Sequence, residues 1–179
     1  MKKKLFFYIQ MMAGFVEVPE PEWVQLGNAT KIIRDWLMDF CIISCERFGK
    51  SSSMYKSFNT LDTCFLRVRS KLDDFVCGAY PMNKHDVAGQ SITSVFFGQR
   101  ITPSYISPTS YKRGQLPKSF DGTHRHQFDL LIKNIEALFA SLNQHPYIVA
   151  RFKGGRDANA HLKRFYKCLQ KTKDLVAAQ

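Results

Sequence analysis

Hydrophobic side chains recur every three or four residues in four segments of the chain, which is the spacing that one face of an amphipathic helix requires. The first segment runs from Pro21 to about Phe48 and stops at Gly49. The second begins near residues 51–53, whose serine hydroxyls can cap the free N–H groups of a helix, and continues to Phe75. These patterns predict two consecutive long helices.

The third segment, about Thr123–Asn143, ends before Pro146 because the residue preceding a proline disfavours helical geometry. After Tyr147–Phe152, the pair Gly154-Gly155 allows a tight turn, and a last helix follows. The inward face of this last helix is expected to contain Ala158, Leu162, Phe165 or Tyr166, and Leu169. Four main helices close naturally as a bundle.

Between Gly78 and Gly122 the helical pattern breaks. Prolines, glycines and many Ser and Thr predict irregular structure around a short apolar run, Ile92 to Phe97. A structureless loop of this length is rare in a compact domain, so part of it should form a short helix or hairpin. The prediction is one all-α domain, residues 1–179, built as a four- to five-helix bundle with 78–122 as an irregular insertion between the second and third main helices.

Composition narrows the class of protein. The chain is 45% hydrophobic and has 15 Phe, which excludes a wholly disordered protein. No apolar stretch reaches the roughly 18 to 20 residues that span a bilayer, so no transmembrane segment is expected. Lys2–Ile9 looks like the start of a secretory signal, but Gln10 interrupts it and no cleavage site is clear. We expect it to belong to the folded chain.

The cysteines are odd in number and show no paired C-x-x-C spacing. Four of them fall in apolar helical patterns, which indicates buried free thiols and a cytoplasmic location. The five positions are Cys41, Cys45, Cys64, Cys77 and Cys168.

The net charge of the chain indicates what kind of partner it binds. The 26 Lys and Arg exceed the 15 Asp and Glu, giving a formal charge of +11, which favours a polyanion such as nucleic acid or an anionic membrane surface. Positive charge is densest near the C-terminus, where only Asp157 and Asp174 oppose it. The bases there are Arg151, Lys153, Arg156, Lys163, Arg164, Lys167, Lys171 and Lys173. A solvated helix face is the alternative, but unrelieved like charges favour RNA binding.

A second basic region lies in the insertion, from Gln99 to Phe120. It combines Arg100, Lys112 and Arg113 with aromatic side chains, a mixture that suits single-stranded nucleic acid. An equally good interpretation is a loop that charge keeps soluble and that its aromatic residues, Tyr105, Tyr111 and Phe120, anchor.

The start of the last helix holds the candidate chemistry. Its N-terminal N–H groups and the guanidinium of Arg156 can hold a phosphate. His161 lies one and a half turns further along and can exchange a proton near neutral pH, as 2′-hydroxyl attack on RNA requires. The two residues start from well separated bearings, so the long arginine must bend along the helix for them to converge.

Arg156-Asp157-x-x-x-His161 resembles the motif of the HEPN (higher eukaryotes and prokaryotes nucleotide-binding) family, small helical bundles whose ribonucleases carry an Arg, a polar residue and a His. The resemblance implies metal-independent endoribonuclease activity with Arg156 and His161 catalytic. It also implies a homodimer that pairs two motifs, and a role as a toxin or antiviral defence effector with a neutralising antitoxin. Asp157 stands where the family commonly has Asn.

Two other functions stay open. A non-catalytic basic subunit would bind RNA in a ribonucleoprotein assembly through the last helix and the loop. A membrane-surface protein would use Lys2–Phe15, and this is the weakest hypothesis. Neither a cofactor nor a metal is expected, because the chain has no Gly-rich phosphate loop and His124 and His126 lack a zinc spacing.

Overall fold

The computed structural model describes residues 18–80, 86–87, 90–91, 94–97 and 119–179. Within these ranges the chain is almost entirely helical, which confirms the predicted all-α bundle. The helices are α2 (Glu20–Phe48), α3 (Ser53–Ala79), α4 (Gly122–Asn143), α5 (Pro146–Gly154) and α6 (Arg156–Ala177).

Local sequence explains where α2 and α3 begin and end. Pro21 occupies the first turn of α2, where a missing N–H costs no hydrogen bond. Acidic residues in that turn interact favourably with the positive end of the helix dipole. Gly49 ends the helix at a φ of 83°, which glycine adopts without steric cost. The Ser52 hydroxyl then accepts a hydrogen bond from the Tyr55 N–H at 3.1 Å and caps α3.

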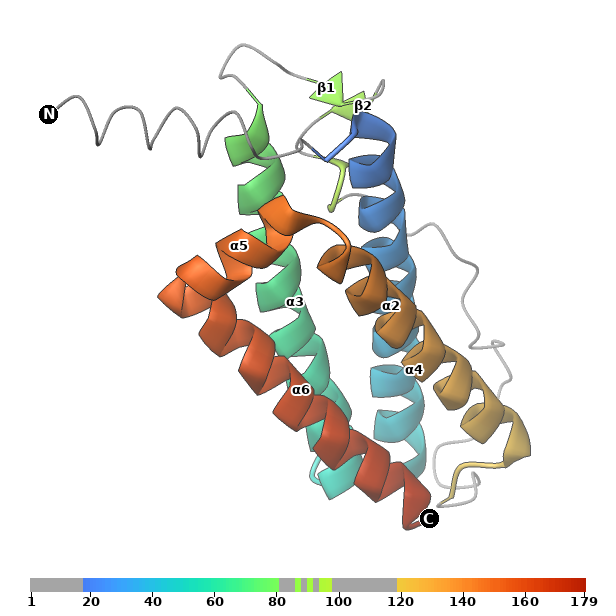
Figure 1. Ribbon diagram of the computed structural model, residues 1–179. Coiled ribbons are helices and arrows are strands. Elements are labelled where there is room, and N and C mark those ends of the chain that lie inside the picture. The colour runs from blue at the N-terminus through green and yellow to red at the C-terminus, as the bar shows by residue number, and fades with distance from the viewer. Residues whose placement is uncertain (1–17, 81–85, 88–89, 92–93, 98–118) are drawn as a thin grey trace, which may run out of the picture.

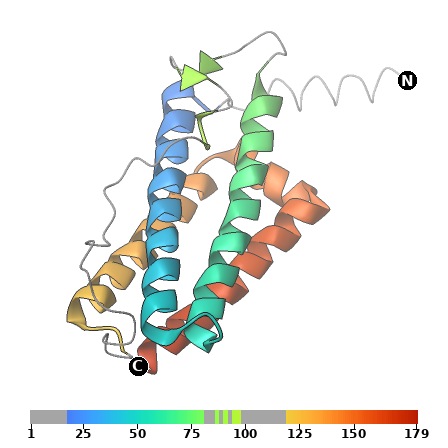
Figure 2. The same ribbon diagram turned by 180° about the vertical axis from the view of Figure 1, so that it is seen from behind.

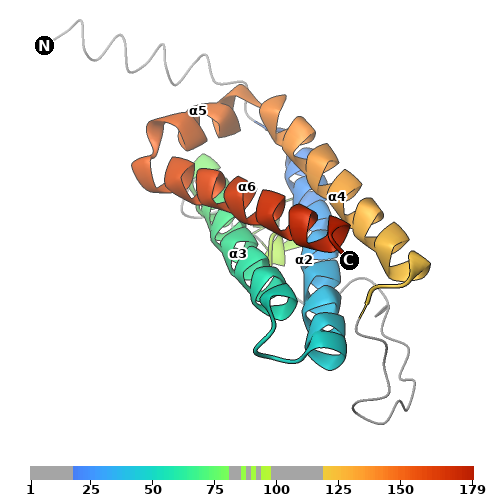
Figure 3. The same ribbon diagram turned by 90° about the horizontal axis from the view of Figure 1, so that it is seen from below.

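The helices form two packed layers. α2 and α3 run antiparallel as a pair, seen from behind in Figure 2. α4 packs on α2 and α6 packs on α3, so both cross in front of that pair in Figure 1. The view from below in Figure 3 shows α6 running between α3 and α4, with the short α5 joining α4 to α6.

Aromatic side chains fill the space between the layers. Near the α2–α3 turn, Phe40 stacks on Phe58 with ring centroids 5.1 Å apart, and Phe128 of α4 meets both rings edge to face. Phe65 of α3 and Phe165 of α6 are fully buried with centroids 5.6 Å apart. These contacts hold α4 and α6 onto the α2/α3 pair through non-directional burial of apolar area.

Parts of the insertion are ordered against this core. β1 (Asp86–Val87) pairs antiparallel with β2 (Gln90–Ser91), which agrees with the hairpin, one of the two forms expected there. Val95 and Phe96 are buried, and the Val95 carbonyl lies where a Cβ on Gly27 of α2 would be. Val95 of the insertion therefore packs backbone to backbone on α2, which only a glycine at position 27 allows.

The loop residue Phe120 is also buried. Its ring meets Phe40, Phe48 and Phe58 edge to face, at centroid distances of 6.0, 5.2 and 6.1 Å. This favours the interpretation in which aromatic residues anchor the loop. Tyr105 and Tyr111, with the rest of 98–118, lie outside the described residues.

Two expectations need correction. Tyr147–Phe152, which was not expected to be helical, lies in α5, where Pro146 supplies the preset φ of a first helical position. The cysteines are free but only Cys64 is buried, since Cys77 is exposed and Cys41, Cys45 and Cys168 are half-buried. The narrow inward stripe of each helix leaves its flanks partly open to water.

No helix in the described part of the chain has both the length and the apolar character needed to cross a bilayer.

Candidate nucleic-acid interface

α6 is amphipathic, and its two faces differ sharply in charge. Ala158, Phe165, Leu169, Thr172 and Val176 form the buried face. The opposite face exposes Arg156, Lys163, Arg164, Lys167 and Lys171 to solvent. Both acidic residues of the helix lie near its ends, Asp157 in the first turn and Asp174 in the last. The stretch between them carries basic charge alone.

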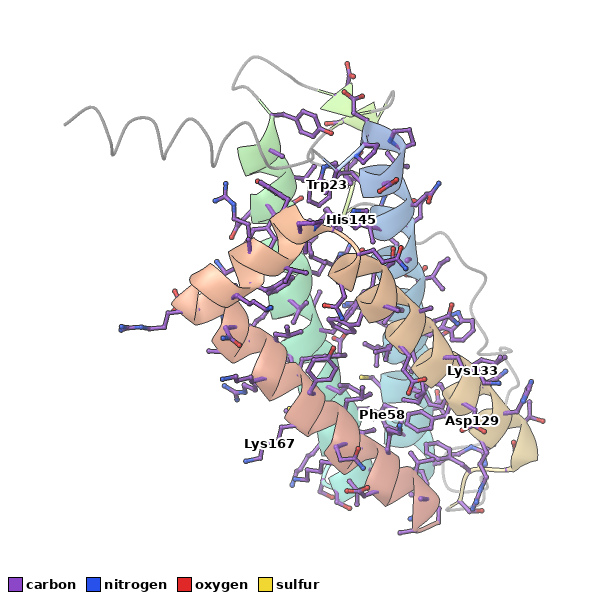
Figure 4. The ribbon with its side chains drawn as sticks, in the orientation of Figure 1. Trp23, Phe58, Asp129, Lys133, His145 and Lys167 are labelled. Carbon is purple, nitrogen blue, oxygen red and sulfur yellow. The ribbon has the colours of Figure 1, made fainter. Side chains whose placement is uncertain are left out.

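The angular positions of these cations around the helix axis divide them into two rows. At about 100° per residue, Arg156, Lys163 and Lys167 fall within about 40° of one another and point straight out of the bundle. Arg164 and Lys171 are rotated toward α3. Figure 4 shows the Lys167 side chain projecting away from the ribbon. The exposed face therefore presents an array of cations rather than one isolated charge.

None of these five cations forms an ion pair within the residues that the structure describes. On the other flank of α6, Lys173 does have an acidic neighbour, because its Nζ lies 3.8 Å from an oxygen of Glu136 on α4. Like charges one turn apart repel each other, so this face is destabilised until an external anion neutralises it.

Arg156 and His161 both lie in the first two turns of α6, but on different sides. Arg156 is exposed on the outer row. His161 is half-buried, about 140° further round, and lies two turns before Cys168, so it shares the flank that packs on α3. In the described chain neither side chain has a hydrogen bond or an ion pair. The separated bearings are as predicted, and their catalytic roles stay predictions.

The structure describes two of the other predicted RNA-contact residues and leaves three outside its described ranges. Arg151 and Lys153 are exposed on α5, just before α6. The Arg151 guanidinium lies 5.1 Å from the centre of the Tyr147 ring, and the Tyr147 hydroxyl donates a hydrogen bond to the Phe75 carbonyl at 3.0 Å. Stacking on this fixed ring orders the Arg151 guanidinium, which lies close to Gly78 of α3. Arg100, Lys112 and Arg113 lie outside the described residues.

A hollow of about 330 Å³ between the start of α3 and the end of α6 extends the basic face. Lys56 and Lys171 approach it from the two helices, and hydroxyl groups fill much of the remaining wall. Its lining is Ser51, Ser53, Lys56, Ser57, Thr60, Cys168 and Lys171. Ammonium and hydroxyl groups both donate hydrogen bonds, which suits phosphate oxygens.

This hollow was not predicted from the sequence pattern. The serines at 51–53 were expected only as helix caps, and Lys56 had no predicted role. Lys56 and Lys171 are far apart in the sequence, and only the packing of α6 on α3 brings them to one hollow. The excess of hydroxyl residues at the start of α3 was the available signal.

A second hollow of about 650 Å³ lies between α2 and α4. His145 Nε2 lies 3.3 Å from a carboxylate oxygen of Glu22 at its edge, where the imidazole also marks the start of α5. The remaining walls are a mixture of small, amide and apolar side chains. Neither hollow is lined by Arg156 or His161.

His124 takes part in a structural contact and not in an anion site. Its ring nitrogen Nδ1 lies 2.6 Å from Asp121, and the ring stacks on Phe120 at 6.0 Å. His126, two residues on, is exposed. Within the described residues, no three His, Cys, Asp or Glu side chains gather where they could hold a metal ion.

Other charges are buried between α2 and α3, on the side away from α6. Arg69 donates a hydrogen bond to the Phe96 carbonyl, and its guanidinium lies 4.4 Å from the centre of the Phe97 ring. Burial, helped by the nearby Arg69 charge, lowers the pKa of Lys31. Arg69 therefore fastens the insertion to α3 and is buried, whereas the cations of the α6 face are exposed to solvent.

Comparison with known proteins gives no relative. No family model matches the chain, and neither a curated protein nor a solved structure matches it. The resemblance to HEPN ribonucleases therefore rests on the spacing of Arg156 and His161 together with an all-α bundle.

Proposed function

We propose that this protein binds RNA through the exposed face of α6, with the hollow between α3 and α6 extending the binding surface. One observation carries the proposal: five cations share this face without an acidic partner in the described chain. The choice of RNA over other polyanions rests on the resemblance to HEPN ribonucleases.

The dimensions of the face suit the backbone of a single strand. Lys163 and Lys171 are eight residues apart, about 12 Å along the helix axis. Arg164 and Lys167 lie between them, so several phosphates can be contacted at once. For a single strand, the logarithm of the affinity falls with the logarithm of salt concentration with a slope of roughly 0.7 per neutralised phosphate. Three to five contacts give a slope of about −2 to −3.5.

A matched pair of lysine substitutions tests the surface. Lys167 on α6 and Lys133 on α4 are both exposed and are both labelled in Figure 4, so each can be changed to Gln at equal cost in net charge. Binding of a fluorescein-labelled 20-nucleotide RNA is measured by anisotropy from 50 to 300 mM NaCl. We expect Lys167→Gln to weaken binding roughly 3- to 5-fold at 150 mM and Lys133→Gln to leave it nearly unchanged.

Combined substitution sharpens the result. Lys163→Gln, Lys167→Gln and Lys171→Gln together should reduce affinity by roughly 30- to 100-fold and make the salt slope shallower by about 2. Equal losses from Lys133→Gln and Lys167→Gln would mean that total charge, and not this face, attracts the RNA. Tighter binding to single-stranded DNA or heparin than to RNA would show that RNA is not the preferred polyanion.

We propose further that the protein cleaves the RNA it binds, without a metal ion. His161 would accept the proton of a 2′-hydroxyl and Arg156 would stabilise the charge that develops on phosphorus. Support comes from their place in the first two turns of α6, next to the basic face, and from the lack of competing partners in the described chain. The non-catalytic binding subunit is the second candidate, and the different bearings of the two side chains favour it.

Cleavage in EDTA separates the two candidates. The purified protein is incubated with labelled total RNA beside His161→Ala, Arg156→Ala and the matched control His126→Ala, an exposed histidine of α4. The ribonuclease proposal expects cleavage by wild type and His126→Ala and a loss of at least 100-fold in the other two variants. Intact RNA with a salt-dependent mobility shift establishes the binding subunit.

A further inference from the structure

Two cysteines from distant parts of the sequence face each other where α6 packs on α3. The Sγ atoms of Cys64 and Cys168 lie 3.3 Å apart. A disulfide needs about 2.05 Å between its sulfur atoms, so only a small movement separates the two thiols from a bond.

Contacts on both sides of the pair keep the two helices in register. Ser57 and Thr172 share a buried hydrogen bond of 2.8 Å on one side. Phe65 and Phe165 pack with ring centroids 5.6 Å apart on the other. The thiols therefore meet in the folded state without any rearrangement of the bundle.

The two sulfur atoms differ in access to solvent. Cys64 is buried, with 3% of its surface exposed. Cys168 is half-buried and lines the hollow to which Lys56 and Lys171 also contribute. Burial raises the pKa of the Cys64 thiol, and its hydrogen bond to Cys168 raises it further. A reagent in solution therefore meets Cys168 first.

We propose that Cys64 and Cys168 form a reversible intramolecular disulfide, in which Cys168 reacts first and Cys64 completes the bond. The oxidant is a small disulfide such as glutathione disulfide. The Cys168 thiolate attacks one of its sulfur atoms, the S–S bond of the oxidant breaks, and one glutathione thiolate leaves and takes a proton. Cys64 then attacks the Cys168 sulfur and expels the second glutathione. Two protein thiols are oxidised and one glutathione disulfide is reduced to two glutathione molecules.

The bond would tie α6 to α3 directly beneath the basic face. Cys168 lies one turn after Arg164 and one turn before Lys171 along α6. Because the link joins positions 104 residues apart, it lowers the conformational entropy of the unfolded chain and so stabilises the folded state. The proposal does not depend on RNA binding, since it rests on the packing of α3 and α6 alone.

The test uses the full chain under native conditions. The reduced protein is incubated with glutathione disulfide, free thiols are blocked with iodoacetamide, and the unreduced protein is mapped by mass spectrometry. We expect two of the five thiols to be lost, an intact mass lower by two hydrogen atoms before blocking, and one linked peptide pair containing Cys64 and Cys168. The melting temperature should rise by about 5 to 15 °C and return to its starting value with dithiothreitol.

Variants separate the roles of the two cysteines. Cys64→Ser should stop at a mixed disulfide on Cys168, Cys168→Ser should gain no linked pair, and the exposed control Cys77→Ser should behave as wild type. If Cys64→Ser does not fold, the wild-type peptide map decides alone. Five free thiols after incubation, a different cysteine pair, or a lasting mixed disulfide in wild type would overturn the proposal.

Discussion

The Asp121 carboxylate holds the start of α4 through several contacts. It accepts a hydrogen bond from the His124 backbone N–H at 2.9 Å and lies 2.6 Å from the ring nitrogen of the same residue. Arg47, near the end of α2, approaches it at 3.3 Å and donates to the Ser119 carbonyl at 2.8 Å. One side chain thus caps a helix and helps to join two helices across the insertion.

Replacing Asp121 by Ala should lower the free energy of unfolding by about 1 kcal/mol at pH 7 through the lost cap. The His124 backbone hydrogen bond, followed by the His124 side chain and Arg47, lowers the pKa of the Asp121 carboxyl in the folded state. Its stabilisation is therefore complete above the ordinary carboxyl pKa, near 4, and is lost as pH falls through the lower folded value. Urea unfolding of both proteins from pH 7 to pH 2.5 measures the difference.

Asp129→Ala serves as the matched control, because Asp129 is an exposed carboxylate of the same helix, labelled in Figure 4, and caps nothing. Its effect should stay within about 0.5 kcal/mol. If the wild type and Asp121→Ala remain equally far apart at pH 2.5, the carboxylate charge is not what stabilises the start of α4.

At the scale of elements, α2 and α3 are joined by apolar packing and by a shielded ion pair. Arg34 Nε lies 3.0 Å from Asp62 Oδ1, with the side chains 19% and 14% exposed, although the N–H is not aligned for a hydrogen bond. Burial raises the pKa of Asp62, while the charges of Arg34 and Arg69 act in the opposite direction. The pair stabilises the helix contact mainly because each charge relieves the other.

Removing one partner should therefore cost more than removing both. Arg34→Met is expected to lower the free energy of unfolding by about 2 to 3 kcal/mol, because it leaves a shielded carboxylate without its nearest cation. Adding Asp62→Asn should restore about 1 to 2 kcal/mol. Urea unfolding of wild type, Arg34→Met, Asp62→Asn and the double variant gives the coupling energy of this double-mutant cycle. Arg67→Met, a change at an exposed arginine of α3, serves as the control. Additive losses would show that the two charges do not interact.

At the scale of the whole molecule, charge and packing act against each other. The chain carries a formal charge of +11, and much of it lies on the outer face of α6. α6 is held in place by Phe165 and Leu169, which are buried against the bundle. The aromatic core therefore keeps together a surface whose charges repel one another.

Salt should consequently stabilise this protein. Raising NaCl from 10 to 200 mM is expected to raise the melting temperature by about 2 to 4 °C, since screening weakens the repulsion among cations more than it weakens the few exposed ion pairs. The variant in which Lys163, Lys167 and Lys171 are all Gln should melt higher than wild type at 10 mM and respond less to salt. A wild-type melting temperature that falls with salt would contradict this account.

Much of the fold could be predicted because its signals are local. Ser52, Gly49 and Pro146 mark helix ends through backbone geometry that each residue sets for itself. α5 was missed because nine residues give too short a periodic pattern to distinguish from a linker. Lys56 was missed at the candidate interface because its role depends on Lys171, which another helix supplies.

Local pattern along the chain predicts the four long helices, the apolar stripe of each and the basic stretch from Arg151 to Lys173, because periodicity and charge are properties of neighbouring residues. Other features follow from the packing of the helices: Cys64 meets Cys168 at 3.3 Å, Phe120 enters the core, and His161 lies on the α3 flank while Arg156 faces solvent. These depend on how α6 packs against α3 and how the insertion packs on α2. Burial of apolar area selects that packing from many arrangements that the same helical pattern allows.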